Sequence, residues 1–176
     1  MTMKAWRLDR LGGDLRLENV PMPEVRPGSI LVRVEASKLM SYIKPYVEGR
    51  LPLYHAPSGG FTPGGNCVGT IETAGRDVWQ LAPGQRVLVA SLFRSSENVA
   101  DPAQILIGVT SFGPDSEKVQ ADWPDGTLAE YVSGVVGCPR RRFRGHGSDT
   151  TCGGQPLRHP LWRTGPRQAR GRRNAS

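Results

Sequence analysis

Apolar and charged residues alternate along several short stretches of the chain, and turn residues separate these stretches. Such alternation is typical of strands that have one buried and one solvent-facing side. It predicts strands at residues 3–8, 15–20, 29–37, 67–74, 86–92 and 127–132. Almost no segment shows the spacing of an amphipathic helix. The pattern therefore predicts a mainly β fold, a small β-barrel or β-roll with few short helices.

Proline and glycine mark the connections between these strands. Pro21–Gly28 carries three prolines, which cannot donate ladder hydrogen bonds, so we expect a loop or a sheet edge there. Residues 52–65 are dense in Pro and Gly, and residues 93–126 have a mixed, loop-like composition. The turn Ala82-Pro83-Gly84-Gln85 suits type II geometry, in which Gly84 would supply the positive φ.

Charge divides the chain into two unlike parts. The whole sequence has a formal net charge of +7, which by itself would suggest a nucleic-acid-binding protein. Residues 1–132, however, hold 13 basic and 15 acidic side chains, for a net charge of −2. Residues 133–176 hold ten Arg, no Lys and one acid, Asp149, for a net charge of +9. We therefore expect a near-neutral folded domain at 1–132 and a separate tail at 133–176.

The tail has the composition of a segment that does not fold by itself. It has six large apolar residues among eight Gly, four Pro and ten Arg. Burial of so few apolar side chains cannot offset the conformational entropy lost on ordering. The sequence therefore predicts that residues 133–176 are disordered.

Cysteine usage and the N-terminus bear on the compartment. Three Cys give no disulfide framework of the kind that small secreted domains use. The first ten residues carry charges where a signal peptide needs an apolar run, and no segment has the apolar length of a membrane span. We expect a cytoplasmic protein that does not enter a membrane.

Six sequence pieces stand out by their order and spacing. They are Met3-Lys-Ala-Trp6, Val32-Arg-Val-Glu-Ala-Ser37, Gly49, Pro63-Gly-Gly-Asn-Cys-Val-Gly-Thr-Ile-Glu-Thr-Ala-Gly75, Pro83-Gly-Gln-Arg-Val87 and Gly126-Thr-Leu-Ala-Glu-Tyr-Val132. Through these pieces, residues 3–132 resemble the N-terminal, GroES-like catalytic domain of the medium-chain dehydrogenase/reductase superfamily, the zinc-type alcohol dehydrogenase and quinone oxidoreductase group. The resemblance implies a partly open barrel and a role in hydride transfer between a nicotinamide cofactor and an alcohol/carbonyl or enone/quinone substrate.

The resemblance also implies where zinc-dependent members carry their metal ligands. Their catalytic Cys corresponds to Met40, and their His-Glu pair corresponds to Gly65 and Asn66. Catalytic zinc takes about three protein ligands from Cys, His and carboxylate side chains. Residues 93–115 likewise hold none of the four Cys of the family's structural zinc lobe. We therefore expect a zinc-independent branch.

The same loop contains the candidate catalytic residue. Tyr42 stands where the family has a Ser or Thr for proton relay, and its hydroxyl could polarise a carbonyl as hydride arrives. The alternative is that Met40, Tyr42 and Tyr46 only line a pocket or fill core. The expected substrate-cleft residues are Met40, Ser41, Tyr46, Gly65 and Asn66.

A cofactor site is expected outside this sequence. Hydride-transferring members have a Rossmann domain with a Gly-x-Gly-x-x-Gly turn, and no predicted strand here is followed by that turn. The abrupt change of composition after about Val132 is what an out-of-frame reading of a GC-rich gene would produce. We therefore expect a truncated oxidoreductase with a frameshifted tail, inactive alone. The resemblance implies NAD or NADP as the cofactor and a small molecule as the substrate.

Other interpretations rest on isolated features. The Arg-rich tail could bind nucleic acid or an anionic surface, but its aromatic residues are not regularly interleaved, so we do not expect nucleic acid as the partner. Cys67 and His55 could form a nucleophilic pair, and the domain could be a co-chaperonin. A metal site in the tail is a further alternative whose spacing matches no zinc finger: Cys138, His146, Cys152 and His159.

Overall fold

The computed structural model describes residues 1–95, 98–113, 115–135 and 141–142, and these are mainly β with short helices, as the sequence predicts. The helices are α1 (Ile43–Val47) and α2 (Ser116–Asp122). The strands are β1 (Thr2–Arg7), β2 (Arg16–Pro21), β3 (Ser29–Ser37), β4 (Cys67–Ala74), β5 (Arg86–Val89), β6 (Leu92–Arg94), β7 (Gln104–Leu106), β8 (Thr110–Phe112), β9 (Tyr131–Val135) and β10 (Arg141–Arg142).

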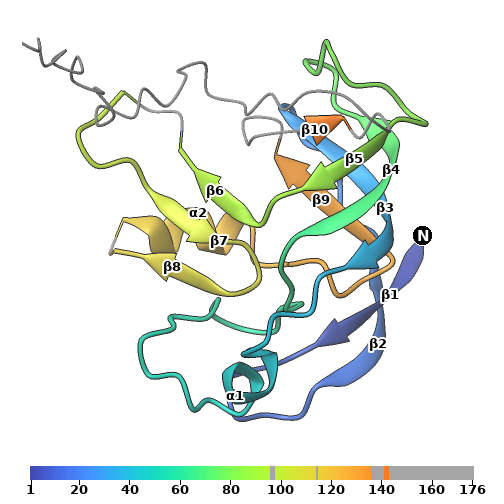
Figure 1. Ribbon diagram of the computed structural model, residues 1–176. Coiled ribbons are helices and arrows are strands. Elements are labelled where there is room, and N and C mark those ends of the chain that lie inside the picture. The colour runs from blue at the N-terminus through green and yellow to red at the C-terminus, as the bar shows by residue number, and fades with distance from the viewer. Residues whose placement is uncertain (96–97, 114, 136–140, 143–176) are drawn as a thin grey trace, which may run out of the picture.

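The strands form separate antiparallel sheets, and in the described part of the chain these do not close into one barrel (Figure 1). The first sheet is the predicted pair β1–β2, in which Met3 lies opposite Val20. The largest has the order β10-β5-β4-β3-β9, and β6-β7-β8 form a third beside it with α2. The partly open architecture expected from the resemblance is therefore present.

Two apolar clusters hold these sheets together. The first lies on the large sheet and includes Ile30, Val32, Cys67, Ile71, Val87 and Val132. The alternating apolar positions of β3 and β4 explain it, because successive strand residues point to opposite faces. The second cluster, of Leu8, Tyr46, Phe61 and Val109, joins β1, α1 and the loop after β7. The candidate site lies where Met40 and Tyr42 pack against this second cluster.

Several predicted boundaries were wrong. The segment 93–126 is not simply a loop, because it contains most of the β6-β7-β8 sheet and α2. The strand predicted at 86–92 is divided into β5 and β6 at residues 90–91. The predicted type II turn has its expected glycine, since Gly84 has a φ of +82° and Gln85 N–H lies 3.3 Å from the carbonyl oxygen of Ala82.

The junction with the predicted tail lies within a sheet. β9 begins at Tyr131 rather than Thr127 and continues to Val135, which pairs with Ser29 of β3. β10, at residues 141–142, pairs with β5. Disorder of the remaining tail, the suggested tail metal site and tail-mediated nucleic-acid binding concern residues outside those described. No helix in the described part of the chain is long and apolar enough to cross a membrane.

Candidate functional site

A cavity of about 460 Å³, called the cleft below, brings together residues from distant parts of the chain. Its walls come from the loop after β3, the residues before β4, the β5–β6 connection and the end of β7. The lining residues are Lys38, Leu39, Met40, Ser41, Tyr42, Gly65, Asn66, Ser91 and Leu106. All predicted site residues except Tyr46 therefore line one cavity.

Hydrogen bonds hold the two main walls of the cleft together. Lys38 N–H donates to the carbonyl oxygen of Asn66 at 2.8 Å. The buried hydroxyl of Thr127 donates to the carbonyl oxygen of Gly65 at 3.0 Å. Because this bond uses the only proton of Thr127, the Ser37 hydroxyl, 2.6 Å from Thr127 Oγ1, donates to it. The end of β3 and the approach to β4 are thus joined through Thr127.

Gly64 permits the close approach on which this connection depends. Its φ is +152°, and a Cβ at this position would lie 2.3 Å from the backbone nitrogen of Thr127. A side chain would therefore push the two segments apart. The glycine in the Pro63-Gly64-Gly65 sequence has a structural reason that is independent of any ligand.

Met40 and Gly65 face each other across the cleft. A Cβ built on Gly65 would lie 3.4 Å from Met40 Cγ and 3.6 Å from its sulfur, so the Met40 side chain occupies the space in front of the glycine. The three positions at which the resemblance places zinc ligands thus supply a thioether, no side chain and the amide of Asn66. This donor set does not fit a catalytic zinc ion.

Tyr42 lines the cleft with a hydroxyl that stays protonated at neutral pH. It follows β3 and immediately precedes α1, and its ring centroid lies 5.5 Å from that of Tyr54. Burial, followed by a hydrogen bond with Tyr54, raises the pKa of Tyr42 above its usual value. A neutral phenol in this position can donate a hydrogen bond but cannot act as a base.

Ser91 is a cleft residue that the sequence does not reveal. Its backbone N–H and its hydroxyl lie 3.0 Å and 3.1 Å from Oδ1 of Asn66. A serine between two apolar segments carries no motif, and its partner lies 25 positions earlier in the chain. Only the pairing of β4 with β5 brings the two residues together.

Tyr46 does not line the cleft. It lies in α1, is fully buried among Leu8, Phe61 and Val109, and donates from its hydroxyl to the carbonyl oxygen of Val109 at 2.6 Å. This burial raises its pKa. The sequence could not separate the two tyrosines, which are one helical turn apart, and the second fills core.

The only charged side chain that lines the cleft within the described part of the chain is that of Lys38, which is exposed. No carboxylate or imidazole is among its lining residues. The described residues also contain no group of three or more His, Cys, Asp or Glu side chains that could hold a metal ion. The cleft can therefore donate hydrogen bonds, but it has no evident general base.

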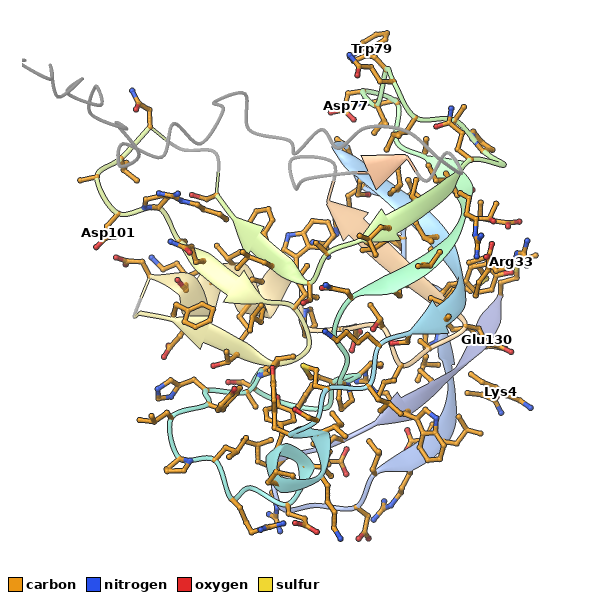
Figure 2. The ribbon with its side chains drawn as sticks, viewed as in Figure 1. Lys4, Arg33, Asp77, Trp79, Asp101 and Glu130 are labelled. Carbon is orange, nitrogen blue, oxygen red and sulfur yellow. The ribbon has the colours of Figure 1, made fainter. Side chains whose placement is uncertain are left out.

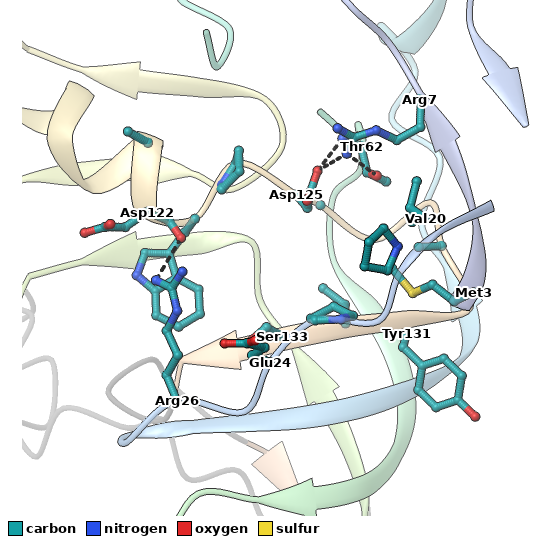
Figure 3. A pocket seen from close by; sticks show the side chains of 18 residues that line it. Met3, Arg7, Val20, Glu24, Arg26, Thr62, Asp122, Asp125, Tyr131 and Ser133 are labelled. Carbon is teal, nitrogen blue, oxygen red and sulfur yellow. Dashed lines mark hydrogen bonds and ion pairs between the residues drawn. The ribbon is translucent and has the colours of Figure 1, made fainter. Parts of the chain in front are cut away.

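A second cavity of about 460 Å³, called the β9 pocket below, lies along β9 between the segment before β3 and the loop after α2 (Figure 3). Both of its arginines have protein partners. Arg7 donates to Asp125 and, at 3.2 Å, to the hydroxyl of Thr62. Arg26 lies over the ring of Trp123 at 5.4 Å from its centroid. These contacts connect β1 to the loop after α2.

Cys67 and His55 belong to different surroundings. Cys67 is buried in the first apolar cluster, and this burial raises its pKa to about 12. At neutral pH the thiolate needed for nucleophilic attack is therefore scarce. His55 lies in the loop after α1, where its backbone N–H donates to the Thr110 hydroxyl and its carbonyl oxygen accepts from Gln120.

Known proteins resemble this chain in sequence and in fold. A family model described as the alcohol dehydrogenase GroES-like domain matches residues 26–135. An alcohol dehydrogenase of Moraxella sp. (strain TAE123) is 37% identical over 130 residues, which cover 74% of this chain and 37% of that protein. The chain thus spans little more than a third of that curated relative's length.

Two solved structures share the fold. A cobalt- and zinc-bound thermostable alcohol dehydrogenase from Pyrobaculum aerophilum matches 76% of this chain and 39% of its own, with 19% identity and a TM-score of 0.58. The crotonyl-CoA carboxylase/reductase AntE in complex with NADP matches 76% of this chain and 35% of its own, with 20% identity and a TM-score of 0.55.

Proposed function

Because the chain belongs to the alcohol dehydrogenase GroES-like domain family, we propose that it forms the substrate side of the catalytic cleft of a zinc-independent oxidoreductase. The reaction transfers hydride between NAD or NADP and a small substrate, an alcohol/carbonyl or an enone/quinone. The observation that carries this proposal is the single cavity lined by Met40, Ser41, Tyr42, Gly65 and Asn66, at the positions of the family's metal ligands.

Tyr42 replaces the metal as the group that polarises the substrate oxygen. When hydride reaches a carbonyl carbon, the π electron pair moves to the oxygen, which becomes negative and must be stabilised. Tyr42 shares a hydrogen bond with Tyr54 in the free cleft, and it would turn its hydroxyl proton toward the substrate oxygen when a ligand binds. The raised pKa of Tyr42 favours this donation over ionisation at neutral pH. Met40 supplies an apolar wall beside the reacting carbon.

The nicotinamide cofactor supplies the hydride when it is bound. The cleft-lining residues offer no pyrophosphate site of their own. NADP in the AntE structure supports a nicotinamide cofactor for this chain as well. The same proposal includes the division into a domain at 1–132 and a tail, the small-molecule substrate and the cytoplasmic location.

Ligand binding is the appropriate test, because the chain spans little more than a third of its curated relative. Cyclohexanone, a neutral cyclic ketone, is titrated into isotope-labelled chain and followed by NMR. We expect saturable shifts of the backbone amides of Met40, Ser41, Gly65 and Asn66. Tyr42→Phe should weaken the affinity about tenfold, because it removes one hydrogen bond to the ketone oxygen. Wild-type protein should carry no zinc by elemental analysis.

Two outcomes would overturn the proposal. Shifts confined to Trp123, Tyr131 and Ser133 would place the ligand in the β9 pocket instead. An affinity unchanged in Tyr42→Phe would remove Tyr42 from the site even if the cleft binds the ketone. Tyr131→Phe is a matched control, since Tyr131 lies outside the cleft and should leave the affinity unchanged.

A further inference from the structure

The acceptor groups of Asn66 are already occupied by protein donors. Its backbone carbonyl oxygen accepts from Lys38 N–H at 2.8 Å. Its side-chain Oδ1 accepts from the backbone N–H of Ser91 at 3.0 Å and from the Ser91 hydroxyl at 3.1 Å. These bonds fix both the backbone and the side chain of a residue that lines the cleft.

The chemistry of Ser91 decides which way the Asn66 amide points. A backbone N–H can only donate, so the Asn66 atom that it contacts must be the oxygen and not the nitrogen. The amide nitrogen then lies in the same plane on the opposite side of Cγ, away from Ser91. Asn66 is half-buried and lines the cleft. Within the described part of the chain, its Nδ2 has no hydrogen-bond partner. Two N–H donors therefore remain for a ligand.

The free amide complements the Tyr42 hydroxyl. Tyr42 enters the cleft from the loop after β3, and Asn66 enters from the residues before β4, so the two donors come from walls that Thr127 holds together. The Asn66 amide, which Ser91 holds in place before a ligand arrives, costs little reorganisation when charge develops on an oxygen. No lining carboxylate competes for them.

We infer that Asn66 is a second hydrogen-bond donor to the substrate oxygen, and that Ser91 is the positioning residue that aims it. This inference rests on the proposed function, because it assigns the ligand oxygen to the same cleft. It adds a specificity: the cleft selects ligands with a carbonyl or other acceptor oxygen that can take two neutral donors, and it disfavours ligands that present only a donor there.

Asn66→Asp tests the donor directly. The carboxylate keeps the oxygen that accepts both Ser91 bonds, but it replaces the donating amide NH2 group by a second acceptor oxygen. We expect cyclohexanone affinity to fall at least about tenfold, because a hydrogen bond is lost and two oxygen atoms then face each other. Asn19→Asp is the matched control with the same charge change on the exposed β2 strand, and it should leave the affinity unchanged.

Ser91 is tested with an alanine and a threonine variant. Ser91→Ala removes the hydroxyl bond and leaves the backbone bond, so we expect affinity to fall about threefold. Ser91→Thr keeps a hydroxyl and should restore it. A nuclear Overhauser effect between the ketone's α-protons and the Asn66 amide protons should be present in wild type, weaker in Ser91→Ala and recovered in Ser91→Thr. A role confined to stability would change the melting temperature without changing this signal.

The outcomes separate this inference from the proposed function. If Tyr42→Phe loses affinity while Asn66→Asp does not, the cleft binds the ketone but Asn66 is not a donor, and the inference is wrong. If wild-type chain shows no saturable shift with cyclohexanone, both fail. If Asn66→Asp and Tyr42→Phe each lose affinity and Asn19→Asp does not, the two-donor site is supported.

Discussion

The cleft and the β9 pocket have the same volume, about 460 Å³, yet their polar groups are used in opposite ways. In the β9 pocket the arginines have protein partners: Arg7 donates to Asp125 and Thr62, and Arg26 donates to the Asp122 carbonyl oxygen and lies over the Trp123 ring. In the cleft, the oxygen atoms of Asn66 accept hydrogen bonds from the protein, while its amide NH2 group has no partner in the described part of the chain. The difference teaches that the free amide donors of Asn66, rather than cavity size, mark the proposed ligand site, because the unpaired Ser133 hydroxyl of the β9 pocket is itself buried.

The largest expected effect is a loss of stability when Arg7, which lines the β9 pocket, is replaced. Arg7→Met removes donations to Asp125, Thr62 and the Gly60 carbonyl oxygen, and Arg7 is only 18% exposed. We expect the free energy of unfolding to fall by about 2 kcal/mol, measured by urea denaturation, because the partly buried Asp125 carboxylate loses its counter-ion. Cyclohexanone affinity should not change in the folded variant.

Arg16→Met is the matched control for Arg7→Met. Arg16 pairs with Asp14, but both side chains are mostly exposed, at 59% and 80%. Exposed pairs of this kind contribute about 0–1 kcal/mol. If Arg7→Met were no more destabilising than Arg16→Met, or if it weakened ketone binding, the two cavities would not have the separate roles assigned to them.

Tyr42 and Tyr46, one helical turn apart, should separate ligand binding from stability. Tyr46→Phe leaves the buried carbonyl oxygen of Val109 without its donor, so we expect a loss of about 1–2 kcal/mol of stability and no change in ketone affinity. Tyr42→Phe should do the reverse, with a small change in stability and about tenfold weaker binding. Denaturation and titration of both variants give the check, and the same profile for both would contradict it.

A smaller effect of opposite sign is expected in the β9 pocket. The Ser133 hydroxyl is buried and has no hydrogen-bond partner in the described part of the chain (Figure 3). Burial of an unpaired hydroxyl costs free energy, so Ser133→Ala should raise the unfolding free energy by up to about 1 kcal/mol. A clear loss of stability in Ser133→Ala would mean that this hydroxyl does have a partner.

The smallest effect concerns pH. The pKa of Tyr42 is raised above its usual value, so its hydroxyl stays protonated throughout the neutral range. Ketone affinity should therefore be flat from about pH 6 to about pH 9 and should fall only as pH approaches the raised pKa, where the donor is lost. A change of affinity near neutral pH would reveal an imidazole or carboxyl group at the ligand, contrary to the lining residues.

Much of the fold could be predicted because it depends on local patterns. The bounds of β3 and β4 agree with the predicted 29–37 and 67–74, since both strands are long and rich in β-branched residues. β7 and β8 were missed because three residues are too few to show an alternation. The family resemblance, confirmed by the match to residues 26–135, came from the order of motifs.

The candidate site also has residues that the sequence predicts and residues that it does not. Motif positions indicated Met40, Tyr42, Gly65 and Asn66, which the structure places around one cavity. Ser91 could not be predicted, because its contact with Asn66 depends on strand pairing across 25 positions. Tyr46 was expected in the cleft with Tyr42, but the packing of α1 against Phe61 and Leu8 places its side chain in the core.

One exposed aromatic residue, Trp79, lies outside both cavities. Trp79, in the loop between β4 and β5, is 88% exposed (Figure 2) and is not among the lining residues of the cleft or of the β9 pocket. We therefore expect no NMR shift of its indole N–H when a ketone binds in the cleft.

The most direct test of the central claim is the zinc content of the triple variant Met40→Cys, Gly65→His, Asn66→Glu. These substitutions supply three side chains of the kind that catalytic zinc takes, and a Cβ at Gly65 has room, with its nearest contacts at 3.4 Å. If the cleft is the family's catalytic site with its metal ligands replaced, the purified variant should bind about one zinc per chain while wild type binds none. A folded variant without zinc, or wild-type protein that retains it, would contradict the account.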